Sequence, residues 1–77
     1  MNLNNTTQSP SVRRLILNGR FQFYFRTFIC QPLLHVAMQD TWIKYDSLRD
    51  TQVEVYDLEN RFIGIAKFTA QVEVSNA

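Results

Sequence analysis

Hydrophobic and polar residues alternate with a period of two along most of this chain. The clearest run covers residues 20–29. One face of that run carries Phe21, Phe23, Phe25, Thr27 and Ile29, and the other carries Arg20, Gln22, Tyr24, Arg26 and Phe28. A helix would spread these phenylalanines around its circumference, whereas a strand gathers them on one side. We therefore predict one continuous strand over residues 20–29, with Phe23 and Phe25 in the core.

The same alternation predicts strands at residues 12–17, 41–46, 52–57 and 61–68, and a last short strand at 69–74. In the strands at 41–46 and 52–57, we expect Ile43, Val53 and Val55 to face the core and Trp42, Lys44, Glu54 and Tyr56 to face the other way. Only residues 33–40 contain apolar residues at helical spacing. That segment spans about two turns, so a short helix or a loop is expected there.

Turn-forming residues separate these runs. Asn18-Gly19 is the strongest hairpin signal, because both residues accept a positive φ, and Asn60 suits a second hairpin. Gly64 lies within a predicted strand, which indicates a bulge or a close backbone approach. The pattern predicts an all-β protein, a small antiparallel β-barrel of five to six short strands with at most one short helix.

The 77 residues are enough for one domain. We assign residues 12–74 to the barrel and residues 75–77 to a polar tail. Residues 1–11 are polar and without periodicity, which is typical of a flexible N-terminal arm or an appended leader.

The residue inventory argues against catalysis, so we predict that the chain is not an enzyme and has neither a cofactor nor a small-molecule substrate. Cys30 and His35 are the only residues of their types, too few for a metal site of three or four ligands. Asp46, Asp50 and Asp57 fall in or beside predicted turns, where such side chains commonly bond to the local backbone.

The number of cysteines and the hydropathy of the sequence indicate the cellular compartment of the protein. A single cysteine cannot form an internal disulfide, and the sequence has neither an apolar run of 18 residues nor the features of a signal peptide. We predict a soluble, cytoplasmic protein with no membrane partner.

Charge is unevenly distributed. Residues 1–45 contain five Lys or Arg against one Asp, whereas residues 46–77 contain three against six Asp or Glu. Cations that bind phosphates and rings that stack on bases or sugars together indicate a nucleic-acid partner. We expect Arg20 and Arg26 to share one strand face, with a neighbouring strand bringing Lys44 beside them. The predicted nucleic-acid-binding residues are Arg13, Arg14, Arg20, Tyr24, Arg26, Trp42 and Lys44. On the alternative interpretation, Tyr24 and Trp42 complete the core and the arginines only keep the surface soluble.

Residues 43–66 resemble the C-terminal β-barrel of Mu-type transposases. The similarity rests on Lys44-Tyr45-Asp46, a turn containing Asp50, Val53-Glu54-Val55-Tyr56-Asp57, and Phe62-Ile63-Gly64-Ile65-Ala66. Upstream, Leu17-Asn18-Gly19-Arg20 followed by Phe23-Tyr24 is similar to the family's opening hairpin. The chain departs from the family pattern at Asn60, where the family has glycine, and at Ser47, where it has proline in a turn one residue shorter.

This resemblance implies a non-catalytic module that follows a retroviral-integrase-like catalytic domain of the same transposase. Such a module helps to hold DNA, contacting phosphates without sequence specificity. The alternative is an SH3-like protein-interaction barrel, which would bind a peptide on an aromatic groove or sheet edge or pack against a parent enzyme.

Overall fold

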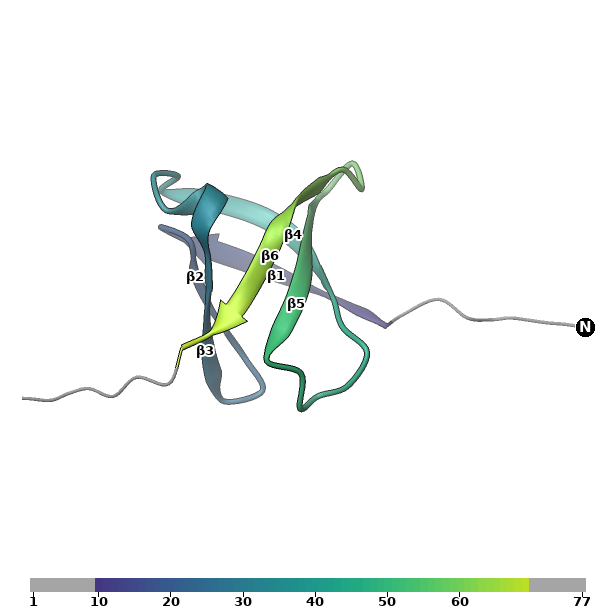
Figure 1. Cartoon of the computed structure of the whole chain (residues 1–77). Coiled ribbons are helices and arrows are strands. Elements are labelled where there is room, and N and C mark those ends of the chain that lie inside the picture. Colours follow the sequence, from purple (N-terminus) through teal and green to yellow (C-terminus); the bar gives the residue numbers. More distant parts are fainter. Residues whose placement is uncertain (1–9, 70–77) are drawn as a thin grey trace, which may run out of the picture.

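The computed structural model describes residues 10–69, which form an all-β closed barrel of antiparallel strands (Figure 1). Around the barrel the strand order is β1-β2-β3-β6-β5-β4. The strands are β1 (Ser11–Leu17), β2 (Arg20–Phe23), β3 (Arg26–Cys30), β4 (Met38–Lys44), β5 (Gln52–Asp57) and β6 (Phe62–Phe68). The predicted fold class is therefore confirmed.

The Asn18-Gly19 hairpin forms as predicted. Both residues have positive φ, 51° and 81°, and the flanking pair Leu17↔Arg20 closes a two-residue turn between β1 and β2. Gly19 is required sterically as well, since a Cβ there would lie 2.9 Å from Leu34 Cδ2. β1 begins at Ser11, one residue before the predicted start, and residues 1–9 of the predicted arm lie outside the described residues.

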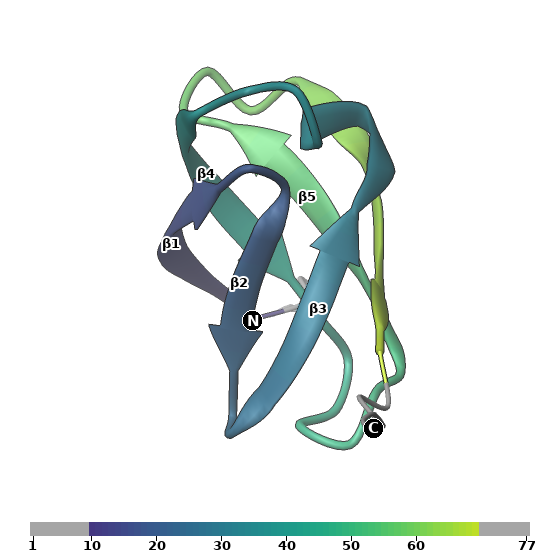
Figure 2. The ribbon, with the colours of Figure 1, turned by 90° about the vertical axis from the view of Figure 1, so that its left-hand side faces the viewer.

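The predicted continuous strand over residues 20–29 is wrong. The chain reverses at Tyr24-Phe25, where φ is 55° and 68°, and the strands on either side pair from Phe23↔Arg26 to Arg20↔Ile29 (Figure 2). Alternation cannot detect this reversal, because apolar residues continue through the turn with no Gly, Asn or Pro to mark it. Beyond the turn the face assignment inverts, so Phe28 is fully buried and Phe25 is 95% exposed.

The core gathers the inward residues of all six strands and the 3₁₀ helix. Phe23, Phe28 and Tyr45 pack ring against ring, with centroids 5.8 Å apart for Phe23–Phe28 and 4.8 Å for Phe23–Tyr45. Burial of Phe23, Ile43, Val53 and Val55 is confirmed, whereas the predicted burial of Phe25 is wrong. The buried apolar residues are Ile16, Phe21, Phe23, Phe28, Cys30, Leu33, Ile43, Val53, Val55 and Ala66.

The short helical element lies slightly earlier than predicted. A single 3₁₀ turn covers Gln31–Leu33, with Pro32 in its first positions, and β4 starts at Met38, three residues before the predicted strand. β4 begins this early because β1 pairs with it along its whole length, from Ser11↔Lys44 to Leu17↔Met38.

Both expectations for the last hairpin are met. Asn60 adopts φ 68°, and a Cβ on Gly64 would lie 2.8 Å from Pro32 Cγ, so Gly64 allows a close approach. A bulge also occurs, because Val55 pairs with Gly64 and Tyr56 with Phe62, which leaves Ile63 as the extra residue. β6 ends at Phe68, and residues 70–74 of the predicted last strand lie outside the described residues.

Candidate nucleic-acid interface

A row of cationic and aromatic side chains crosses the outward face of β1, β4, β5 and β6. The strand register places Arg13 opposite Trp42, Trp42 opposite Tyr56, and Tyr56 opposite Phe62. The Arg13 guanidinium carbon lies 5.6 Å from the Trp42 ring centroid. The Tyr56 and Phe62 rings meet edge to face at 5.5 Å. With Lys44, these residues form what we call the cation–aromatic strip: Arg13, Trp42, Lys44, Tyr56 and Phe62.

Lys44 joins the strip through Tyr56. Its Nζ lies 4.2 Å from the Tyr56 ring centroid, which is close enough for a cation–π interaction. The Tyr56 hydroxyl donates a 2.9 Å hydrogen bond to Glu54 Oε1, and this bond is the main reason that the pKa of Tyr56 is raised. The phenol therefore stays neutral. Lys44 contacts the Tyr56 ring and Glu54 accepts a bond from its hydroxyl, so both ends of the side chain have a partner.

Two carboxylates border the strip. Asp40 Oδ1 lies 3.4 Å from Arg13 Nη2, and Glu54 accepts the bond from Tyr56. The side chains of Arg13 and Asp40 are about half exposed, and exposed pairs of this kind contribute little to stability. Arg13 is consequently able to exchange Asp40 for another anion at small cost.

The predicted grouping of Arg20, Arg26 and Lys44 is wrong. Arg20 is exposed and pairs with Ile29, whereas Arg26 pairs with the buried Phe23 and so lies on the opposite face of the hairpin. β4, which carries Lys44, is bonded to β1 and β5 and to neither β2 nor β3. The reversal at Tyr24-Phe25 separates the two arginines, and the barrel closure separates both from Lys44.

Arg26 has a structural role instead. Its guanidinium lies 5.2 Å from the Phe28 ring and 5.4 Å from the Phe68 ring. It also donates hydrogen bonds to the Leu48 and Arg49 carbonyls, which ties the β2–β3 hairpin to the turn between β4 and β5.

The remaining predicted site residues lie apart from the strip. Arg14 bonds to backbone carbonyls of Arg13 and Gln22, and Tyr24 lies at the exposed tip of the β2–β3 hairpin. Of the seven predicted residues, the structure brings together Arg13, Trp42 and Lys44. Sequence reasoning missed Tyr56 and Phe62, although alternation already placed Tyr56 on the outward side with Glu54. Pairing the predicted strands 41–46 and 52–57 as neighbours would have placed Tyr56 beside Trp42.

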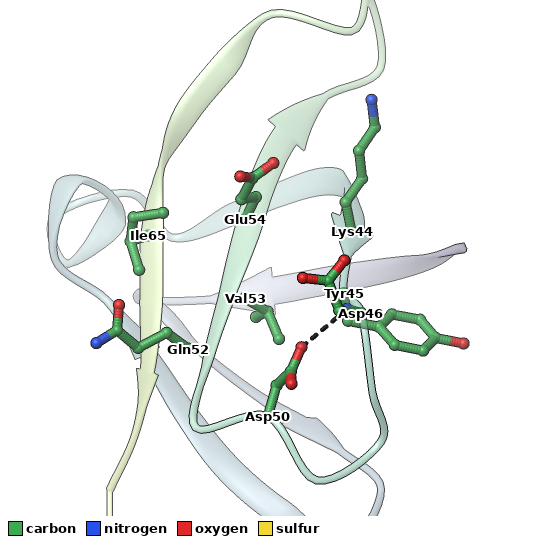
Figure 3. A pocket seen from close by; sticks show the side chains of 8 residues that line it. All are labelled: Lys44, Tyr45, Asp46, Asp50, Gln52, Val53, Glu54 and Ile65. Atoms are coloured by element: carbon green, nitrogen blue, oxygen red, sulfur yellow. Dashed lines mark hydrogen bonds between the residues drawn. The ribbon is translucent and has the colours of Figure 1, made fainter. Parts of the chain in front are cut away.

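A shallow hollow of about 190 Å³, which Lys44 of the strip helps to line, lies between the β4–β5 turn and β5 (Figure 3). Its carboxylates come from Asp46, Asp50 and Glu54. Figure 3 shows Asp50 turned back toward the chain, where its Oδ2 accepts bonds from the Asp46 and Ser47 amides at 2.8 and 3.1 Å. No group of three or more His, Cys, Asp or Glu among residues 10–69 is placed to hold a metal ion.

Asp57 likewise organises a turn. Its Oδ1 accepts bonds from the Glu59 and Arg61 amides, and its Oδ2 lies 3.0 Å from Arg61 Nε. The bond from the Arg61 amide is the largest cause of the lowered pKa of Asp57. Asp50 and Asp57 therefore bond to the backbone of their own turns, as the sequence predicted.

Cys30 is fully buried, and burial raises the pKa of its thiol. The thiol is therefore held in its unreactive protonated form. His35 lies on the exposed segment after the 3₁₀ turn.

Within residues 10–69, no helix is long and apolar enough to cross a membrane. No family model, curated protein or solved structure matches the chain.

Proposed function

We propose that this chain is a non-catalytic DNA-binding module that contacts phosphates without reading the base sequence. The observation that carries the proposal is the cation–aromatic strip, in which Arg13 and Lys44 flank the rings of Trp42 and Tyr56 on one outward face. Cations so placed bind phosphates, and the rings offer flat surfaces to sugars or unpaired bases.

The parent protein in this proposal is a DNA transposase, on the strength of the resemblance over residues 43–66. The motifs that carry the resemblance lie in β4, β5, β6 and their turns, which also supply most of the strip. The module's second partner would be the catalytic domain of that transposase, whose catalytic residues lie outside this chain. The module itself would require no cofactor and no small-molecule substrate.

Binding by the isolated module should be weak. Asp40 and Glu54 border the strip and repel phosphates, so only part of the positive charge is effective. We expect dissociation constants on the order of 10⁻⁴ to 10⁻⁶ M, the range of non-specific binding.

Titration of labelled duplex DNA at low salt tests this proposal. The Arg13→Ala/Lys44→Ala variant should bind more weakly on every DNA sequence, because it loses both cations of the strip. Arg49→Ala/Lys67→Ala is the matched control, since it removes two exposed cations elsewhere and leaves the same net charge. Equal losses in both variants, or no binding by the unaltered protein, would contradict the proposal.

The bordering carboxylates support a second candidate function, the binding of a basic peptide. Asp40 and Glu54 lie near the partly exposed rings of Trp42 and Tyr56, an arrangement suited to lysine or arginine side chains of a peptide partner. Binding of a polylysine peptide at the strip, together with no binding of duplex DNA by the protein, would favour this function over the first.

A further inference from the structure

Three exposed apolar side chains lie together on the outward face of β1 and β4. Leu17 is directly opposite Met38, and Leu15 lies two residues before Leu17, with the buried Ile16 between them. Directly opposed residues of antiparallel strands point to the same face, as do residues two apart on one strand. The exposed fractions of Leu15, Leu17 and Met38 are 49%, 51% and 62%. We call these three residues the apolar patch.

A charge of opposite sign lies on each side of the apolar patch. On the β2 side, Arg20 is directly opposite Leu17. On the β4 side, Asp40 is directly opposite Leu15. Because β1 lies between β2 and β4, Arg20 and Asp40 occupy diagonally opposite corners of this face.

Both charges can take a further partner. Arg20 donates a 3.3 Å hydrogen bond to the Asn18 carbonyl, and no carboxylate within residues 10–69 forms an ion pair with it. Asp40 contacts Arg13 at 3.4 Å through Oδ1 alone, and both of these side chains are about half exposed. An exposed pair of this kind is weak, so Asp40 can accept a second cation at small cost.

The face is also complementary to itself in shape. A hollow of about 420 Å³ borders the apolar patch on the β2 side, and its lining residues are Leu15, Leu17, Arg20, Phe21, Gln22 and Thr27. Met38 lies on the other side of Leu17 and is the most exposed member of the patch. Methionine is flexible and fills irregular gaps. The face therefore has a projecting apolar side chain on one side and a hollow on the other.

We propose that two copies of this chain associate through this face about a twofold axis. The axis lies in the interface and passes between Leu15 and Leu17, so that Arg20 of each copy contacts Asp40 of the other. Leu17 and Met38 of each copy cover the apolar patch of the other. A twofold interface joins one surface to itself, so a cation on it needs a carboxylate on the same surface. The diagonal placement of Arg20 and Asp40 meets this requirement, and the net charge of +1 leaves little repulsion between copies.

The proposed dimer is weak and does not depend on DNA binding. Three apolar residues and two ion pairs form a small interface, of the kind found in transient complexes. Neither Arg20 nor any residue of the apolar patch belongs to the cation–aromatic strip. Loss of DNA binding through Arg13 and Lys44 can therefore be distinguished from loss of association through Arg20.

Sedimentation equilibrium of the 77-residue protein, from micromolar to millimolar concentration, tests the proposal. The mass of the unaltered protein should rise toward that of two chains. Arg20→Asp should weaken association about tenfold or more, because it places two carboxylates opposite each other at both contacts. Lys67→Asp makes the same change in net charge at an exposed position outside the face and should leave association unchanged. A protein that stays monomeric at millimolar concentration, or equal losses in the two variants, would overturn the proposal.

Mixing two variants tests the crossed contacts directly. Asp40→Arg should also weaken self-association, because it places two guanidiniums opposite each other. An equimolar mixture of Arg20→Asp with fluorescent Asp40→Arg should form a heterodimer about as tightly as the unaltered protein dimerises, since both contacts again join a cation to a carboxylate. Lys67→Asp mixed with fluorescent Asp40→Arg has the same net charges but one repulsive contact, and should form less heterodimer. Equal heterodimer formation in the two mixtures, or none in the first, would overturn the proposal.

Discussion

Two phenylalanines three positions apart have opposite environments in this barrel. Phe28 is fully buried against Phe21 and Phe23, with ring centroids 5.6 and 5.8 Å away, whereas Phe25 is 95% exposed at a hairpin tip. Their stability contributions should therefore differ widely, and in the opposite order from the one that the alternation of residues 20–29 predicts, since that pattern places Phe25 on the core face and Phe28 on the other.

Phe28→Ala should lower the free energy of unfolding by about 3–5 kcal/mol, because it leaves a cavity in the core. Phe25→Ala should change it by about 0.5 kcal/mol or less, as expected at an exposed position. Urea denaturation monitored by circular dichroism measures both. Similar losses in the two variants would show that the chain does not reverse at Tyr24-Phe25.

Asp57 should make stability depend on pH in the acid range. Its folded-state pKa is lowered, first by the Arg61 amide, so its contribution is complete above the ordinary Asp pKa and is lost as pH falls through the lowered value. The difference in unfolding free energy between the unaltered protein and Asp57→Asn should shrink as pH is lowered from about 6 to about 2. A difference that stays constant over this range would contradict the lowered folded-state pKa of Asp57.

At the scale of the element, the two hairpin turns of the N-terminal half differ in how well their sequences suit them. Asn18-Gly19 fits a turn with two positive φ values, whereas Tyr24-Phe25 adopts the same region with bulky side chains. The first turn was predictable, since its residues favour that conformation. The second was not, because it is imposed by the pairing of Phe21 with Phe28 and of Phe23 with Arg26 in the closed barrel.

Replacing the strained turn by Tyr24→Asn/Phe25→Gly should raise the free energy of unfolding by about 1–2 kcal/mol. Gly19→Ala is the opposing control and should lower it, because the new Cβ meets Leu34 at 2.9 Å and the backbone is left-handed. Thermal and urea unfolding measure both changes. Destabilisation by Asn-Gly would mean that the Tyr24 and Phe25 side chains support the fold in a way that their exposure does not indicate.

At the scale of the whole molecule, barrel closure decides which side chains meet. Alternation along the sequence correctly placed Trp42 and Lys44 away from the core side of Ile43, and Glu54 and Tyr56 away from Val53 and Val55. It could not reveal that β4 lies between β1 and β5, since that order depends on pairings between residues about 30 positions apart, such as Arg13↔Trp42. In the closed barrel, β4 pairs with β1 and not with β2 or β3. Arg13 therefore lies beside Trp42, whereas Arg20 and Arg26 lie on strands that do not contact the strand of Lys44.

Nuclear magnetic resonance of the isotope-labelled protein, titrated with duplex DNA at low salt, tests the proposed binding of DNA to the outward face of β1, β4 and β5. If DNA binds at the strip, the largest shifts should occur at the Trp42 indole N–H and at the amides of Arg13, Lys44 and Tyr56. The amides of Leu15 on β1 and Gln22 on β2, which lie outside the cation–aromatic strip, should shift little. Shifts concentrated at Leu15 and Gln22 or at the Tyr24-Phe25 tip, or no shifts at any DNA concentration, would contradict DNA binding at the strip.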